Sequence, residues 1–213
     1  MKIATGGLSW IVAASFLLIL AGIGTFFLSD ILQIFGYFFF GFFFFAFIIL
    51  LIFFRDPDRK VGNGIVAVAD GLIQEITEID DQGQHWIRIS TFMNIHNVHV
   101  NRMPMDGEII QISHHSGGYI PAFKKESERN ERVELVIKTS IGLIKIMLIA
   151  GTIARRIVPY VQQGDVVKKG KRIALIRLGS RVDVSFPRTA VKIVIHRRER
   201  VRAGVDTIAT TDV

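Results

Sequence analysis

The chain contains no cysteine, and this absence removes several kinds of site at once. Disulfide bonds, thiolate nucleophiles and cysteine-ligated zinc all need a thiol, so none of them contributes to fold or chemistry here. Proline is scarce as well, with five residues in 213, so few positions forbid the backbone hydrogen bonds of a strand. Charge is almost missing up to Phe54, where Lys2 and Asp30 are the only charged residues and cancel. The formal net charge of +7 therefore belongs entirely to the residues after Phe54.

Two long apolar runs fill this uncharged part, over residues 8–28 and 31–54. A helix of roughly 20 apolar residues crosses a bilayer core, so each run is long enough. Because only Ser29-Asp30 separates them, the pattern predicts a membrane-anchoring helical hairpin over residues 1–54 with both ends on one side. A signal peptide and buried core helices are the alternatives. Whether the hairpin spans the whole bilayer is left open.

Basic residues at both ends of the predicted hairpin indicate its orientation. Lys2 lies at one end, Arg55, Arg59 and Lys60 lie at the other, and the turn has no Lys or Arg. The positive-inside rule then predicts a cell-membrane protein whose second domain is on the cytoplasmic face. A basic domain held there is expected to bind an anionic membrane surface, with roughly 1 kcal/mol from each nearby Lys or Arg. No nucleic-acid-binding motif is present, so nucleic acid is not expected as a partner.

The second predicted domain, residues 55–213, has the pattern of a mostly β protein. Short β-branched segments bounded by turn residues predict strands at 65–68, 71–76, 85–90, 107–112, 133–139 and 142–149. We expect an antiparallel β sandwich or barrel. A weak internal repeat over 160–176 and 200–209 resembles the halves of lipoyl and biotinyl carrier modules. A non-enzymatic carrier or adaptor module is therefore an alternative, although no lysine stands at a suitable hairpin tip.

Three motifs occur in one order along this domain. They are Asp70-Gly71, the run 92–104 with two histidines three residues apart, and Gly179-Ser180 within the run 177–183. Each is weak alone, because Asp-Gly and Gly-Ser are common in turns. Together they closely resemble the phosphatidylserine decarboxylase family, and the match runs from about Phe54 to the C-terminus. Arg181 after the serine resembles the short, two-span branch of that family, to which archaetidylserine decarboxylases are similar.

The resemblance implies a zymogen that cuts itself between Gly179 and Ser180. The products are a β chain, 1–179, and an α chain, 180–213, which stay together. Ser180 attacks the carbonyl carbon of Gly179, the amide becomes an ester, and elimination followed by hydrolysis leaves a covalent pyruvoyl cofactor at position 180. The resemblance assigns His99 as the base for Ser180, and Asp70 as the group that orients the imidazole, as an aspartate does in a serine-protease triad.

The resemblance also implies the reaction of the mature enzyme. The pyruvoyl group forms a Schiff base with the amine of phosphatidylserine, or of the archaeal ether lipid, and acts as an electron sink when carbon dioxide leaves. The product is the ethanolamine lipid, and no metal takes part. His96 is implied as the acid for decarboxylation, although His96 and His99 could share the work.

Four further residues come from matched segments and would bind the lipid. Arg155 and Arg156 carry forked guanidinium donors suited to a phosphodiester, and a solvated charged face is the alternative for them. Tyr119 and Phe123 lie in a glycine-containing apolar stretch that would face the acyl chains. Ester or ether lipid, the arginine that binds the phosphate, and the oligomeric state stay open, a homodimer included.

A second enzyme class uses the same histidines. His96 and His99 would be two zinc ligands on a β segment, with further ligands from His85, His114, His115 or a carboxylate. That arrangement predicts a membrane-anchored zinc hydrolase. It leaves the Gly-Ser motif and the run Asn101-Arg102-Met103-Pro104 without a role.

Overall fold

The structure is a computed structural model that describes residues 2–81, 83–118, 120, 129–151, 156–177 and 180–211. The chain forms two compact units, Met1–Pro57 and Asp58–Val213, and each is described by itself. This division lies close to the boundary expected after residue 54. The three sequence motifs at residues 70–71, 92–104 and 177–183 all belong to the second unit.

The first unit holds two long apolar helices. Its elements are β1 (Lys2–Ile3), α1 (Leu8–Phe27), α2 (Asp30–Phe53) and β2 (Arg55–Asp56). Both helices are long and apolar enough to cross a membrane, by length and composition. Many of their large apolar side chains are exposed, Phe26 by 82% and Phe27 by 78%. An apolar surface of this extent is unfavourable in water and is typical of a segment that contacts a membrane or a partner. The helices pack closely at Gly36, where a Cβ atom would press on Thr25 of α1.

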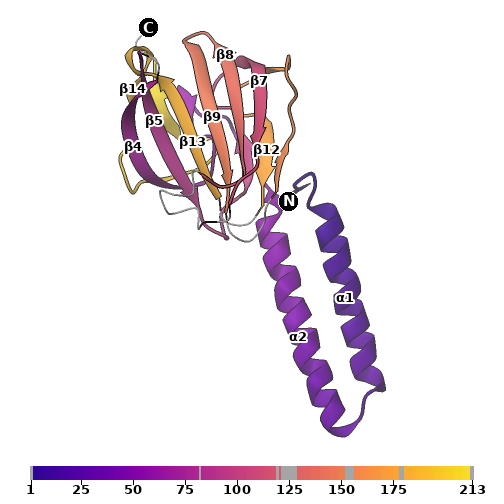
Figure 1. The fold of residues 1–213 in the computed structure, drawn as a ribbon. Coiled ribbons are helices and arrows are strands. Elements are labelled where there is room, and N and C mark those ends of the chain that lie inside the picture. Colours follow the sequence, from indigo (N-terminus) through magenta and orange to yellow (C-terminus); the bar gives the residue numbers. More distant parts are fainter. Residues whose placement is uncertain are drawn as a thin grey trace. The chain divides into compact units, whose positions relative to one another are not determined.

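The second unit is built mainly from strands (Figure 1). They are β3 (Ile65–Val66), β4 (Gly71–Asp81), β5 (Gln84–Met93), β6 (Val100–Arg102), β7 (Gly107–His115), β8 (Arg132–Thr139), β9 (Gly142–Ala150), β10 (Ile157–Pro159), β11 (Val166–Val167), β12 (Arg172–Ile176), β13 (Ser180–Pro187), β14 (Lys192–Ile193), β15 (Arg200–Val201) and β16 (Thr207–Thr210), with a 3-10 turn η2 (Arg188–Ala190). An eight-stranded sheet has the order β11-β7-β8-β9-β13-β5-β4-β15. Three-stranded sheets β10-β12-β6 and β14-β16-β3 complete the unit.

The prediction of a mostly β, antiparallel domain after two apolar helices is confirmed. The six predicted strands correspond to β3, β4, β5, β7, β8 and β9. All named strand pairs are antiparallel. The hydrophobic core lies on one face of the eight-stranded sheet, where β13 contributes Val182, Val184 and Phe186. Ser180 is the first residue of β13, which lies between β9 and β5, so strands of the sheet flank the serine on both sides.

Candidate active site

Ser180 is the first residue of the central strand β13. It lies opposite Met93 of β5 and Ala150 of β9, and its side chain is fully buried. Because side chains alternate along a strand, Ser180 shares the core face with Val182 and Val184. Its hydroxyl donates to the Sδ atom of Met93 at 3.3 Å. A thioether is a weak acceptor, so this contact orients the hydroxyl without holding its proton firmly.

The two histidines lie in the turn that connects β5 to β6. Asn94 and Asn97 build this turn: the amide N–H of Asn94 donates to Asn97 Oδ1 at 2.8 Å, and the N–H of Asn97 donates to the carbonyl of Asn94 at 2.9 Å. His96 is exposed on the turn, whereas His99 is fully buried. The zinc alternative placed both on a β segment, and that placement is wrong, because β5 ends at Met93, β6 begins at Val100 and the paired asparagines bend the backbone between them.

His99 has a defined hydrogen-bond partner that fixes its tautomer. Its Nδ1 atom lies 2.9 Å from the carbonyl oxygen of Asn97, which can only accept, so Nδ1 carries the proton. In this tautomer Nε2 is the ring nitrogen that can accept a proton. The carbonyl of His99 accepts from the N–H of Ile176 at 3.2 Å, at the end of β12. This bond ties the histidine to the segment that leads into Ser180.

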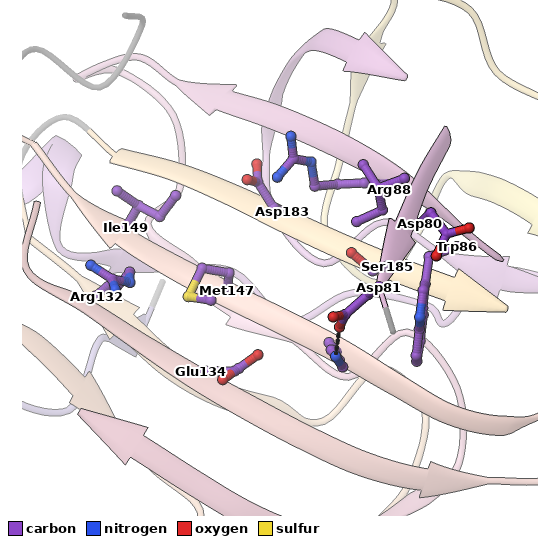
Figure 2. A pocket seen from close by; sticks show the side chains of 12 residues that line it. Asp80, Asp81, Trp86, Arg88, Arg132, Glu134, Met147, Ile149, Asp183 and Ser185 are labelled. Atoms are coloured by element: carbon purple, nitrogen blue, oxygen red, sulfur yellow. Dashed lines mark hydrogen bonds and ion pairs between the residues drawn. The ribbon is translucent and has the colours of Figure 1, made fainter. Parts of the chain in front are cut away.

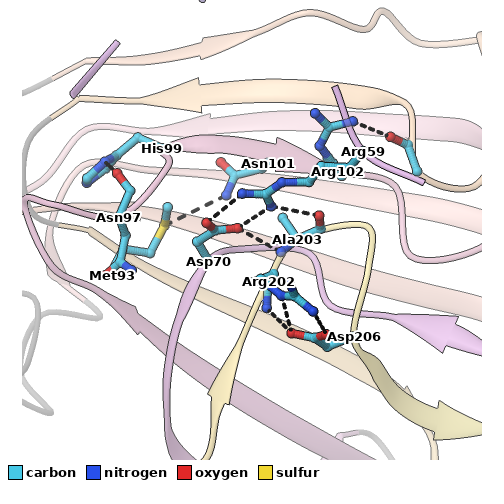
Figure 3. A network of polar contacts seen from close by, with 11 residues as sticks. Arg59, Asp70, Met93, Asn97, His99, Asn101, Arg102, Arg202, Ala203 and Asp206 are labelled. Atoms are coloured by element: carbon cyan, nitrogen blue, oxygen red, sulfur yellow. Dashed lines mark hydrogen bonds and ion pairs between the residues drawn. The ribbon is translucent and has the colours of Figure 1, made fainter. Parts of the chain in front are cut away.

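Asp70 binds different partners from the one that the family resemblance implies (Figure 3). Its Oδ1 atom accepts from Arg59 Nη1 at 2.5 Å and from the N–H of Ala203 at 2.8 Å, and its Oδ2 atom accepts from Arg59 Nη2 at 2.8 Å. Arg59 also donates to the carbonyl of Ala203 at 2.9 Å. The backbone carbonyl of Asn97 therefore has the place beside His99 Nδ1 that was expected for Asp70. Asp70 instead joins Arg59, 11 positions earlier, to Ala203, 133 positions later in the chain.

The ion pair of Arg59 and Asp70 should contribute strongly to stability. The two side chains are only 12% and 9% exposed, and breaking a buried pair strands a charge away from water. We expect Arg59→Met to lower the free energy of unfolding by roughly 3 kcal/mol, measured by urea denaturation in detergent. Glu78→Gln is the matched control, because Glu78 and Arg188 form an exposed pair whose loss should cost less than about 1 kcal/mol. Equal losses of unfolding free energy in the two variants would contradict the expectation that the buried pair contributes more to stability than the exposed pair.

The structure places several residues at the site that had no assigned role. The fully buried Asn101 points its Nδ2 atom at the sulfur of Met93, at 3.8 Å (Figure 3). Asn130 is also fully buried and donates to the carbonyls of Ile120 and of Ala150, the strand partner of Ser180. Asn101 lies on β6, two residues after His99 in the same sequence motif. The side chain of Asn130 contacts residues 10 and 20 positions away, so no short sequence pattern around it indicates these contacts.

Arg156 is exposed and lies beside a second arginine. The N–H of Arg177 donates to the carbonyl of Arg156 at 3.2 Å. Burial lowers the pKa of the Arg177 guanidinium, and repulsion from Arg156 lowers it further. Two cations held together attract an anion, and Arg177 is three residues before Ser180. Gly179, Tyr119, Phe123 and Arg155, also expected at the site, lie outside the described residues.

A hollow of about 420 Å³ lies on the other face of the eight-stranded sheet (Figure 2). It is lined by charged side chains of both signs, and Lys145 donates to Asp81 there at 2.7 Å. Asp183 and Ser185 reach it from β13, so alternation puts it on the opposite face from Ser180. Beside it Arg181 forms a buried forked pair with Asp183, at 2.7 and 2.8 Å. The hollow is therefore separate from the serine.

The zinc alternative needs at least three ligand side chains close together. Within the described residues, no three His, Asp or Glu side chains come together in a way that could hold a metal ion. His96 and His99 differ instead in burial, one on the exposed turn and the other inside the core. The described residues therefore provide no set of zinc ligands to support the zinc hydrolase alternative.

Comparison with known proteins decides the family. The model of the phosphatidylserine decarboxylase family matches residues 46–209. The chain belongs to the phosphatidylserine decarboxylase family. It is thus an enzyme of the carboxy-lyase class. A putative archaetidylserine decarboxylase proenzyme of Methanosarcina barkeri is 48% identical over 164 residues, 76% of each chain. A phosphatidylserine decarboxylase proenzyme of Streptomyces avermitilis is 46% identical over 160 residues, covering 75% of this chain and 73% of the relative.

The decarboxylase match covers the whole described site. The buried serine of β13, the histidine turn and the Asp70 segment all lie inside residues 46–209. Relatives named for archaetidylserine and for phosphatidylserine are nearly equally similar, so identity alone does not favour either name. Both relatives are named proenzymes, a word that denotes processing of those chains.

Proposed function

We propose that this chain is a proenzyme that cuts itself between Gly179 and Ser180 and then decarboxylates a serine phospholipid. The observation that carries the proposal is the buried Ser180 hydroxyl, held only by a thioether among the described residues, in a member of this family. The substrate is phosphatidylserine or its ether-linked archaeal counterpart, and the product is the ethanolamine lipid. The names of relatives of both kinds support this substrate class.

Self-cleavage begins at Ser180, which is a poor nucleophile until a base takes its proton. We assign His99 as that base, because its Nδ1 proton is held by Asn97 and Nε2 remains to accept a proton. Ser180 Oγ attacks the carbonyl carbon of Gly179, and the peptide becomes an ester. Elimination then releases chain 1–179 as a carboxylate. Water converts the dehydroalanine left at position 180 to a pyruvoyl group and ammonia.

The residues around position 180 fit a pyruvoyl group formed in place. The side chain is enclosed by the core, and its neighbour across the sheet is the uncharged Met93. When formed, the group supplies a ketone that draws electrons from the substrate as carbon dioxide leaves. The chain's own contribution is to exclude water at this buried position and to return a proton. We assign that proton transfer to His96, whose exposed turn could meet a lipid headgroup.

Asp70 has two candidate roles in this proposal. The family resemblance assigns it to orient His99, and its contacts support a second role as a clamp. Its carboxylate joins Arg59 to the N–H of Ala203. Ala203 belongs to the proposed α chain and Asp70 to the β chain, so the clamp would hold the two products together after cleavage.

The lipid would be bound by the basic side chains near the site and by the apolar helices. We assign Arg156, together with Arg177, to the phosphodiester, because paired cations gain most from a shared anion. The two apolar helices would anchor the enzyme in the cell membrane, with the basic unit on the cytoplasmic, anionic face.

Decarboxylation can be measured directly. Purified protein in mixed micelles should release carbon dioxide from phosphatidylserine or from an archaeal ether-linked serine lipid, and mass spectrometry should detect the ethanolamine lipid. Free serine should be at least about a hundredfold poorer by kcat/KM, because it lacks the phosphodiester and the acyl or ether chains that bind the enzyme. Release of carbon dioxide from neither lipid, by protein that has been cut at position 180, would refute the proposed activity.

A further inference from the structure

Ser180 and Asn101 both contact the sulfur atom of Met93. Met93 is fully buried and stands directly opposite Ser180 in the pairing of β5 with β13. Ser180 Oγ lies 3.3 Å from the sulfur and Asn101 Nδ2 lies 3.8 Å from it. These contacts form a buried series that links Asn101 on β6, Met93 on β5 and Ser180 on β13. Asn101, where this series of contacts begins, lies on β6, two residues after His99.

Asn101 is an unexpected residue for the place that it occupies. Its side chain is fully buried, and its Oδ1 atom accepts no hydrogen bond from any of the described residues. A buried amide oxygen without a donor destabilises the fold, and a leucine at this position would avoid that cost. Packing alone therefore does not explain the asparagine. Its amide N–H group, directed at the sulfur of Met93, is the contact that a leucine could not make.

A thioether suits a nucleophile better than a stronger acceptor would. Methionine has three rotatable side-chain bonds, so its sulfur needs a second contact to stay in one place, and Asn101 supplies it. The sulfur accepts weakly, so it can select the rotamer of the Ser180 hydroxyl and still release the proton to a base. A carboxylate or amide oxygen in its place would compete with His99 for that proton.

We propose that Met93 is a catalytic residue of self-cleavage, whose thioether holds the Ser180 hydroxyl for attack, and that Asn101 positions this thioether. The inference rests on the proposed self-cleavage of the chain. It adds a third element to the nucleophile and its base, namely the group that sets the direction of the hydroxyl. Positioning of a nucleophile is a large part of its reactivity, so the effect should be measurable as a rate.

The test compares leucine substitutions at two buried methionines. Leucine nearly conserves the volume of methionine and removes the sulfur. Full-length Met93→Leu, made by cell-free translation into nanodiscs, should form the 1–179 and 180–213 chains roughly ten- to a hundredfold more slowly than wild type. Met103→Leu is the matched control, because Met103 is equally buried in the core, whereas among the described residues Ser180 and Asn101 direct their hydrogen bonds to the sulfur of Met93. It should be cut at the wild-type rate.

The pH profile separates positioning from general damage. Neither methionine nor asparagine titrates, so Met93→Leu and Asn101→Leu should lower the plateau rate of cleavage without moving the pH at which it is half-maximal. Asn101→Leu also covers the case in which Met93→Leu fails to fold. Wild-type rates in both variants, or a shifted profile that indicates a disturbed His99, would overturn the inference. An uncut wild-type chain would instead refute the proposed self-cleavage itself.

Discussion

Ser180→Ala should give a single intact chain of 213 residues that never acquires decarboxylase activity. Alanine removes the one hydroxyl that can attack the Gly179 carbonyl, and no pyruvoyl group can form from it. Wild-type protein should instead give two chains, 1–179 and 180–213, the second with a blocked N-terminus. Intact-mass spectrometry after purification measures both outcomes. The loss should be complete, because the residue supplies both nucleophile and cofactor.

A neighbouring serine on the same strand provides the control. Ser185 is buried and lies on β13, but alternation puts it on the opposite face from Ser180. Ser185→Ala should therefore be cut as completely as wild type. The two chains of wild type should also remain associated in detergent, because residues 180–187 lie between β5 and β9 in the sheet. Intact wild-type protein after prolonged incubation would eliminate the mechanism and revive the carrier alternative.

Much of the fold was predictable because its signals are local. The apolar runs of α1 and α2 and the alternation in β4 and β5 are each contained in one stretch of sequence. The family resemblance singled out Ser180 and His99, whose roles stay predictions, and the structure buries both. What could not be predicted depends on contacts between distant segments. The contacts of Ala203 with Asp70 and with Arg59 join residues 133 and 144 positions apart, and no local pattern encodes them.

The same limit explains why His96 and His99 could not be separated by spacing alone. Three residues apart, they looked equivalent as zinc ligands or as shared acids. The structure distinguishes them through Asn94 and Asn97, whose side chain and backbone bonds fold a turn between β5 and β6. Asparagine is a common turn residue, so the bend was readable in principle. Which histidine it would bury depended on the packing of β6 against β12.

His99→Ala and His96→Ala should fail at different stages. His99 is buried with its tautomer fixed, so its loss removes the proposed base, and self-cleavage should slow by roughly a hundred- to ten-thousandfold. His96 is exposed on the turn, so His96→Ala should be cut normally and then decarboxylate poorly. Intact mass against time measures the first stage, and carbon dioxide release from fully cut protein measures the second. Normal cleavage of His99→Ala would show that another group takes the proton of Ser180.

The same time course separates the two roles of Asp70. If the carboxylate acts as a clamp, Arg59→Met and Asp70→Asn both weaken the link to Ala203, so both should loosen the association of the cut chains and should slow cleavage itself only to a similar, small extent. If it orients His99 during the reaction, Asp70→Asn should approach the effect of His99→Ala, and Arg59→Met should not. The contacts in the structure favour the clamp, because the carbonyl of Asn97 already holds His99 Nδ1. We therefore expect paired, modest effects, and a far larger loss in Asp70→Asn than in Arg59→Met would overturn that expectation.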